Sequence, residues 1–69
     1  MSKKESKLKK LRVEQGLSLR DLGQKTGYSY EYIRQIELGN YDNPSVDFIT
    51  KLASALDIDL WEAVELFKS

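Results

Sequence analysis

The chain contains neither cysteine nor histidine among its 69 residues. Without cysteine it can form no disulfide, and without either residue a structural zinc site lacks its usual ligands. A domain of this size has a small core, commonly stabilised by disulfides, a metal, oligomerisation or tight helix packing. We therefore expect helix packing or dimerisation, with no metal and no cofactor. The absence of histidine, cysteine and a glycine-rich phosphate loop also argues against an enzyme.

The sequence also lacks a long apolar segment. No run approaches the roughly 18 residues that a membrane-spanning helix needs, so we expect no membrane partner. The N-terminal segment, MSKKESKLKK, is basic but lacks the apolar stretch of a signal peptide. Together with the absence of cysteine, which fits a reducing compartment, these features predict a cytoplasmic protein.

The net charge is zero, because 11 basic and 11 acidic side chains cancel, but the charges are unevenly distributed. Residues 1–12 contain six basic side chains and one acidic side chain, a net charge of +5. Residues 42–69 contain two basic and six acidic side chains, a net charge of −4. A basic segment can attract nucleic acid even in a neutral protein, although by itself it is more simply interpreted as a solvated N-terminus.

Capping residues and glycines divide the sequence into five short helices. Ser2 and Glu5 have the spacing of a capping box, and Gly16 can end the first helix in a left-handed conformation. Similar signals predict the other helices at residues 19–26, 30–38, 46–56 and 60–67. Neither a linker nor a repeat is evident. We therefore predict a single all-α domain over residues 1–69, a compact five-helix bundle.

Apolar residues at helical spacing identify the predicted core. Its members are Leu8, Leu11, Leu17, Leu22, Ile33, Ile36, Val46, Ile49, Leu52, Ala53, Leu56, Ile58, Leu60 and Val64. Gly23 is unusual inside a helix, where glycine costs about 1 kcal/mol relative to alanine. We expect the close approach of a neighbouring helix to compensate for this cost.

The helix predicted at residues 30–38, YEYIRQIEL, has two different sides. On a helical wheel, Ile33 and Ile36 mark a buried side, with Tyr32 at its edge and Glu37 beside Ile33. The outward side carries Tyr30, Glu31, Arg34, Gln35 and Leu38. Arginine can pair with guanine, glutamine with adenine and glutamate with cytosine. Taken alone, however, this composition favours an ordinary polar helix face.

Residues 17–39, LSLRDLGQKTGYSYEYIRQIELG, contain two short helices joined by a tight turn, the pattern of a helix-turn-helix. The wider sequence resembles the Xre family, which includes phage repressors and Cro. The matching segments are LKKLRVEQGLS, LRDLGQKTGYS, YIRQIELGN and NPSVDFITKLASALDIDL, which span residues 8–60. The last segment is also similar to bacterial regulators of the SinR type.

This resemblance implies a lambda-repressor-like DNA-binding domain, encoded by a bacterium or phage and associated with the nucleoid. It implies a transcriptional repressor that binds double-stranded operator DNA as a homodimer, with residues 30–38 as the recognition helix in the major groove. The residues implied to face the bases are Tyr30, Glu31, Arg34 and Gln35. Those implied to contact phosphates are Ser18, Arg20, Ser29, Asn40, Tyr41, Asn43 and Arg12. Arg12 and Glu37 correspond to an ion pair of family relatives, and the wheel independently places Glu37 beside the core.

Two positions depart from the family pattern. Leu19 stands where relatives often have a glutamine, and Leu38 stands where a polar or basic residue is usual. Together with the neutral net charge, these residues leave a second interpretation open. The chain would then be a protein-interaction module of the same fold, an antitoxin or antirepressor-binding subunit, with a regulatory protein partner and weak DNA binding.

The last predicted helix carries Leu60, Trp61, Val64 and Phe67, more apolar surface than a small core readily buries. These side chains either cover one end of the core or form a dimer interface, where aromatic residues are common. The acidic character of this segment would keep it away from DNA, which favours the dimer interface. Two recognition helices would then lie about 34 Å apart, one turn of DNA.

Overall fold

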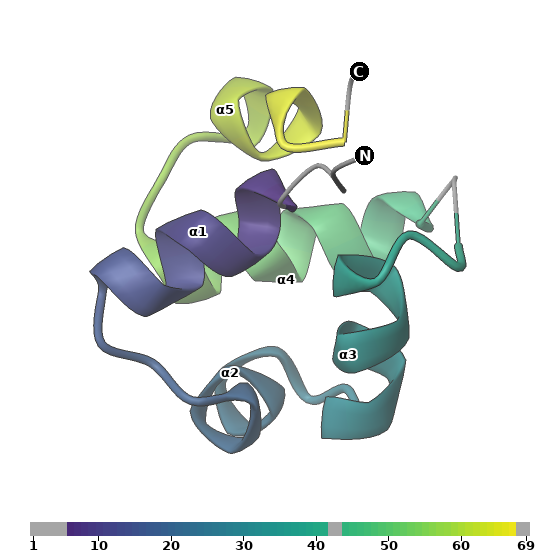
Figure 1. The fold of residues 1–69 in the computed structure, drawn as a ribbon. Helices are drawn as coiled ribbons and strands as arrows, with labels where there is room; N and C mark the ends of the chain where they lie inside the picture. The colour runs from purple at the N-terminus through teal and green to yellow at the C-terminus, as the bar shows by residue number, and fades with distance from the viewer. Residues whose placement is uncertain (1–5, 42–43, 68–69) are drawn as a thin grey trace, which may run out of the picture.

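The computed structural model describes residues 6–41 and 44–67, which form α-helices around one core (Figure 1). The helices are α1 (Lys7–Glu14), α2 (Leu19–Thr26), α3 (Tyr30–Glu37), α4 (Val46–Leu56) and α5 (Leu60–Glu65). Helix α4 packs against α2 and α5, while α3 packs against α2 and α1. No β-strand occurs in these two ranges. The prediction of an all-α five-helix bundle is therefore confirmed.

Each described helix begins at a side chain that caps its first turn by accepting a hydrogen bond from a backbone N–H. The capping residues are Ser6, Ser18, Ser29, Ser45 and Asp59. A cap of this kind contributes about 1 kcal/mol, which explains why helix starts are readable from sequence. The predicted start after Ser2 is wrong, because Ser6 is extended and α1 begins at Lys7. Ser2 and Glu5 lie outside the described residues.

The C-terminal ends agree with the sequence for α2 and α4 but not for α3 and α5. Helix α3 ends at Glu37, and the predicted last residue, Leu38, is its C-cap. Helix α5 ends at Glu65, two residues before the predicted end at Phe67. Terminal turns often differ by one or two residues in this way, because helix ends lack part of the hydrogen-bond ladder.

The core is built around α4. Phe48, Leu52 and Leu56 recur at intervals of four residues along this helix and are fully buried. They pack with buried residues of α1, α2 and α3, namely Leu8, Leu22, Ile33 and Ile36. Because α3 contributes two isoleucines to this cluster, its opposite side is held facing outward.

Two predicted core residues lie at the surface instead. Val46 is 76% exposed and Leu60 is 51% exposed, and each is the first residue of its helix. Val46 lies about 200° around the helix from Phe48, so only one of the two can face the core. Phe48 and Ala63, which the predicted core omitted, are fully buried.

Over residues 6–41 and 44–67, no helix is both long and apolar enough to cross a membrane. In the same part of the chain, potential metal-ligating side chains do not gather in groups of three or more.

Candidate nucleic-acid interface

The turn between α2 and α3 passes directly over Gly23. A Cβ atom at this position would lie 2.9 Å from the backbone oxygen of Tyr28, a distance at which something must shift. Thr26 is buried nearby, and its hydroxyl accepts a hydrogen bond from the Tyr28 N–H at 3.2 Å. Gly27 has a φ of +83°, which turns the chain sharply at the end of α2. The close approach expected at Gly23 therefore exists: the turn makes the nearest contact, and the first residue of α3, Tyr30, lies next, with its backbone nitrogen at 3.5 Å.

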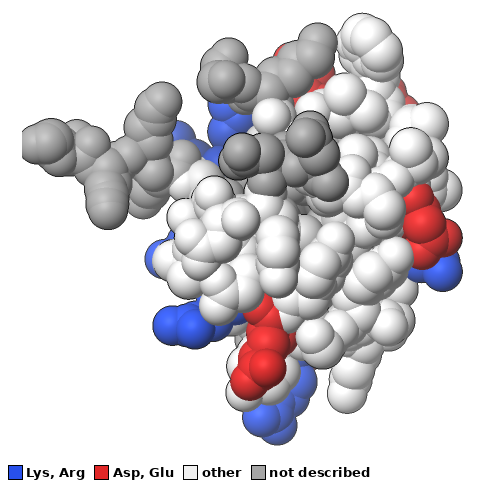
Figure 2. Space-filling model, turned by 90° about the vertical axis from the view of Figure 1, so that its right-hand side faces the viewer, with Lys and Arg blue, Asp and Glu red and all other residues white. Residues whose placement is uncertain are grey.

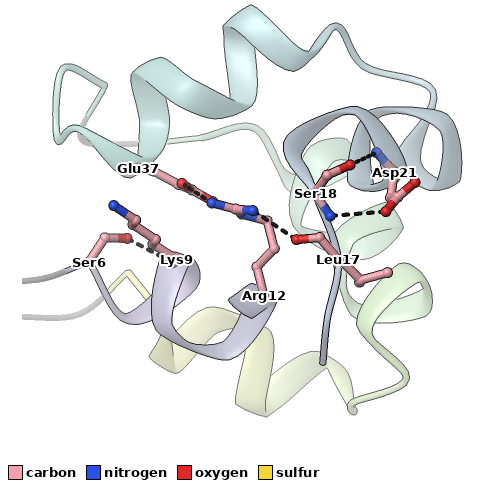
Figure 3. Close-up of polar contacts among 7 residues, drawn as sticks. All are labelled: Ser6, Lys9, Arg12, Leu17, Ser18, Asp21 and Glu37. Atoms are coloured by element: carbon pink, nitrogen blue, oxygen red, sulfur yellow. Dashed lines mark hydrogen bonds and ion pairs between the residues drawn. The ribbon is translucent and has the colours of Figure 1, made fainter. Parts of the chain in front are cut away.

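A reciprocal capping box closes the N-terminus of α2 (Figure 3). Ser18 Oγ accepts a hydrogen bond from the Asp21 N–H at 2.9 Å, and Asp21 Oδ2 accepts one from the Ser18 N–H at 3.0 Å. The hydrogen bond from the Ser18 backbone lowers the pKa of the Asp21 carboxyl. Two amides near the expected phosphate site are thus used within the protein, and a carboxylate lies beside them.

Arg12 joins α1 to the end of α3 and to the segment that leads into α2 (Figure 3). Its Nε donates to Glu37 Oε2 at 2.7 Å, and its Nη2 donates to Glu37 Oε1 at 3.2 Å. Its Nη1 donates to the backbone oxygen of Leu17 at 2.8 Å. The Arg12 and Glu37 side chains are 10% and 5% exposed. The guanidinium is therefore turned mainly toward Glu37 and Leu17 rather than toward solvent.

The outward side of α3 presents polar groups around an open hollow. Tyr30, Glu31 and Arg34 are exposed, whereas Gln35 is half-buried. The hollow has a volume of about 440 Å³, and its lining residues are Ser29, Glu31, Tyr32, Arg34, Gln35 and Tyr41. Figure 2 shows the side of the molecule on which α3 lies, with basic groups near its lower margin and an acidic group between them. Three of the four residues expected to face bases thus share one concave surface.

The fourth residue, Tyr30, lies beside a second hollow between α2 and α3. This hollow has a volume of about 360 Å³, and Arg20 lines it together with Tyr30. The guanidinium carbon of Arg20 lies 5.8 Å from the centre of the Tyr30 ring, within the range of a cation–π interaction. An expected phosphate-contacting residue and an expected base-contacting residue are therefore neighbours.

Three tyrosines and Phe48 form an aromatic cluster that sequence reasoning missed. The rings of Tyr28 and Tyr32 stack with centroids 5.2 Å apart, and their centroids lie 5.0 Å and 5.3 Å from that of Phe48. Tyr41 lies 5.6 Å from Tyr32. The Tyr28 hydroxyl donates to Asp47, and this hydrogen bond raises the pKa of Tyr28 and lowers that of Asp47. The cluster packs the turn, α3 and the loop after α3 against α4. In the sequence, it could be suspected only from the four-residue spacing of Tyr28 and Tyr32.

The loop after α3 contains the remaining residues expected to contact phosphates. Asn40 and Tyr41 are exposed, and Asn43 lies outside the described residues. The Asn40 side chain is not directed only to solvent, because its Nδ2 donates a hydrogen bond to Gln35 Oε1. This contact joins an expected phosphate-contacting residue to an expected base-contacting residue.

The two leucines that depart from the family pattern have different environments. Leu19 is partly buried and packs against the core cluster. Leu38, at the end of α3, is 59% exposed. Leu19 therefore contributes to packing, whereas Leu38 adds apolar surface beside the outward side of α3.

The residues expected to form a dimer interface divide into two groups. Leu60 and Trp61 are 51% and 68% exposed. Val64 and Phe67 are partly buried, and Phe67 packs against the core cluster. Helix α5 lies at the opposite end of the molecule from α2 (Figure 1). The exposed apolar surface of α5 is thus well separated from the helix-turn-helix.

The charge of the described residues changes along the chain. Residues 6–41 contain seven basic and four acidic side chains, a net charge of +3. Residues 44–67 contain one basic and five acidic side chains, a net charge of −4. The part of the molecule formed by α1, α2 and α3 is therefore the part suited to a polyanion.

Comparison with known proteins identifies the family. The helix-turn-helix family matches residues 8–60. The HTH-type transcriptional regulator SinR of Bacillus subtilis (strain 168) is 35% identical over 54 residues. That alignment covers 78% of this chain but 49% of SinR, so the chain spans about half the length of this relative.

Two solved structures are similar over most of their length. The restriction-modification controller protein C.AhdI from Aeromonas hydrophila is 38% identical with a TM-score of 0.78, covering 84% of this chain and 86% of that one. The biofilm master regulator SinR in complex with DNA is 32% identical with a TM-score of 0.79, covering 86% of this chain and 94% of that one. On this sequence match and this shared architecture, the chain belongs to the Xre/Cro-type helix-turn-helix family.

Proposed function

We propose that this chain is the sequence-specific DNA-binding domain of a bacterial or phage transcriptional regulator, acting as a repressor at operator DNA in the nucleoid. The observation that carries the proposal is the concave outward side of α3, where Glu31, Arg34 and Gln35 surround one hollow. This surface belongs to the basic part of the molecule. The similar SinR structure was solved with DNA, which supports the same use of the fold here.

In this proposal α3 lies in the major groove and its side chains read base edges. Arg34 is suited to donate two hydrogen bonds to guanine O6 and N7, and Glu31 to accept one from cytosine N4. Glu31 repels phosphates, so it favours binding only where a base offers a donor. Tyr30, beside Arg20, would contact a base or sugar at the edge of the same surface.

Phosphate contacts would position the domain on the duplex without specifying sequence. Arg20, in the first turn of α2, and Ser29, the cap at the start of α3, are both exposed. The other proposed contacts are Ser18, Asn40, Tyr41 and Asn43, the last on the resemblance alone. Arg12 is the weakest of the expected phosphate contacts, because three of its N–H groups are used inside the protein.

A salt series and a matched pair of substitutions test the DNA-binding proposal. DNA selected from a random pool should bind the parent protein, with affinity falling as salt rises because phosphate contacts release counterions. Arg34→Ala should weaken binding and relax base preference. Arg34→Lys keeps the charge but loses the bidentate donor geometry, so it should retain more affinity than alanine and still lose preference for guanine. If no DNA shifts the parent protein at low salt, the proposal is wrong.

Arg20→Ala provides a phosphate-specific comparison for the same assay. It should weaken binding about equally for all sequences and reduce the slope of log K against log salt by about 0.9. Arg34 and Arg20 are both exposed, so either substitution should change the unfolding free energy by no more than about 0.5 kcal/mol. Loss of sequence preference in the Arg20 variant would contradict the proposed division of roles.

We further propose that two copies associate through α5. The exposed Leu60 and Trp61 would form the centre of a twofold contact, with Val64 and Phe67 at its base. The position of α5 away from α2, and its acidic surroundings, leave the α3 side accessible to DNA (Figure 1). Sedimentation equilibrium should show a dimer that Trp61→Ala weakens. Val13→Ala is the control: it changes an exposed apolar residue on a different helix, α1, and should not alter association.

A protein partner is the second candidate function, and the exposure of Leu38 favours it. A leucine 59% exposed at the end of α3 is better suited to an apolar protein surface than to a phosphate backbone. Leu38→Ser should weaken binding to such a partner and leave DNA binding unchanged. DNA binding lost in the same variant would instead place Leu38 at the DNA surface.

A further inference from the structure

Asn40 is held beside Gln35 by its backbone as well as by its side chain. Gly39 follows α3 with a φ of +84°, a left-handed conformation that glycine adopts readily. The Gly39 N–H then donates to the Ile36 oxygen at 3.0 Å, and the Asn40 N–H donates to the Gln35 oxygen at 3.0 Å. These two hydrogen bonds form a Schellman motif. The motif fixes the position of the Asn40 backbone relative to α3. The side chain of Asn40 therefore starts from a defined position when it contacts Gln35.

The side-chain contact gives the Gln35 amide a direction. Asn40 Nδ2 donates to Gln35 Oε1, so the oxygen of Gln35 is turned toward the loop. The Nε2 group, with its two hydrogens, is the other end of the same planar amide. Gln35 is also half-buried on the wall of the α3 hollow, which restricts how far its side chain can turn away.

This direction matters because a glutamine amide normally reads adenine with both ends. It donates from Nε2 to adenine N7 and accepts at Oε1 from adenine N6. When Oε1 is held by Asn40, the reading end is a donor. Guanine offers two acceptors to this donor, O6 and N7, and thymine offers O4. Adenine offers only N7, and its amino group loses its acceptor.

We propose that Asn40 is a positioning residue that sets the base preference of Gln35. At the base pair that Gln35 reads, guanine or thymine would be preferred over adenine because Asn40 holds the amide oxygen away from the groove. The inference deepens the proposed DNA-binding function and rests on it. It also gives Asn40 a role distinct from the phosphate contact implied by family resemblance.

Asn40→Asp is the decisive variant because it reverses the polarity of the contact. An aspartate carboxylate has no donor, so it repels Gln35 Oε1 and accepts from Nε2 instead. The amide turns over and presents its oxygen to the groove, where adenine N6 or cytosine N4 can donate to it. We expect the ratio of affinities for guanine or thymine over adenine or cytosine to fall by about five- to tenfold, a change worth one hydrogen bond.

The measurement uses fluorescence anisotropy with four duplexes that differ at one base pair, identified as the pair whose preference is lost in Gln35→Ala. The added negative charge of aspartate weakens binding to all four duplexes alike, so the ratio between them cancels it. Asn40→Ala is the second variant: it frees the amide and should let adenine bind as well as guanine. If Asn40 contacted a phosphate without positioning Gln35, both variants would lower all four affinities equally and leave their ratio unchanged.

Two outcomes overturn the inference, and they are distinguishable from failure of the proposed function. If the parent protein selects a sequence but prefers adenine at the Gln35 position, the amide direction is wrong. If the parent prefers guanine or thymine and Asn40→Asp keeps that preference, Asn40 does not set it. A parent protein that selects no sequence at all refutes the DNA-binding proposal, and this inference with it.

Discussion

Replacing Glu37 with alanine should destabilise the domain by about 3–5 kcal/mol, the cost of breaking a buried ion pair by removing one partner. The change removes two of the three hydrogen bonds described for Arg12 and leaves the one to the Leu17 oxygen. The Arg12 side chain is only 10% exposed, so water can replace little of what is lost. At about 0.05–0.15 kcal/mol per residue, a domain of this size has a total stability of roughly 3–10 kcal/mol. Most of that stability would be lost, so the variant should be partly or wholly unfolded at room temperature.

Urea denaturation followed by far-ultraviolet circular dichroism measures this loss, with a conservative variant to keep it quantifiable. Glu37→Gln preserves the shape of the side chain but removes its charge and places an N–H₂ group against one N–H donor of Arg12. It should cost less than alanine, about 1–3 kcal/mol. Glu14→Ala, which removes an exposed glutamate from α1, is the control and should shift stability by no more than about 0.5 kcal/mol.

A double-mutant cycle with Arg12→Met separates the pair from its surroundings. Arg12→Met alone leaves Glu37 buried without its partner and the Leu17 oxygen without its donor, so it should also be strongly destabilising. The double variant, Arg12→Met with Glu37→Ala, removes both charges and should recover part of the loss. If Glu37→Ala costs less than about 1 kcal/mol and the two substitutions are additive, the pair is solvated and the reasoning from burial is refuted.

Three further perturbations test other features. Gly23→Ala should cost about 1–3 kcal/mol in a thermal melt, because its Cβ would meet the Tyr28 oxygen at 2.9 Å; unchanged melting would show that the turn yields freely. Ser29→Ala removes the cap of α3 and should lower the free energy of unfolding by about 1 kcal/mol. Ser29→Asp keeps a capping oxygen and should retain the stability of the parent protein. An aspartate variant as unstable as the alanine variant would contradict the capping role. The pKa values of Asp21 and Asp47 lie below their ordinary value of 3.8, so their stabilising contribution is complete above about pH 5 and is lost as the pH falls through the lowered values. Unfolding free energy measured against pH should therefore decline in acid, and less steeply in the Asp21→Asn, Asp47→Asn double variant; identical acid profiles would refute this assignment.

Much of the fold could be predicted because its signals are local. A capping serine lies directly before its helix and accepts a hydrogen bond from the N–H three residues later, so Ser18, Ser29 and Ser45 correctly predicted the starts of α2, α3 and α4. The same rule predicted a start after Ser2, because Glu5 completes the spacing of a capping box there, whereas Ser6, the actual cap, is followed three residues later by Lys9. The inward direction of Ile33 and Ile36 also follows from spacing alone.

The features that sequence reasoning missed depend on contacts between distant segments. Val46 and Phe48 are both apolar and near the start of α4; the four-residue spacing of Phe48 from Leu52 favours Phe48, but its complete burial requires packing against α2 and α3. The stacking of Tyr28 and Tyr32 against Phe48 likewise requires α4 to be in place. The direction of the Gln35 amide depends on the hydrogen bond from Asn40. The orientation of the Asn40 side chain cannot be predicted from the amino-acid sequence alone.

The short, capped helices have a consequence for how the domain folds. The described helices are six to eleven residues long, below the roughly 12–15 residues at which an isolated helix becomes stable in water. A cap therefore sets where each helix nucleates but cannot keep it formed. Hydrogen exchange should show α1 to α4 opening as one cooperative unit rather than as separate elements. A peptide that contains only α2, α3 and their turn would keep every capping signal and still lose the ordered recognition helix, because Phe48, Leu52 and Leu56 would be missing from its inner side.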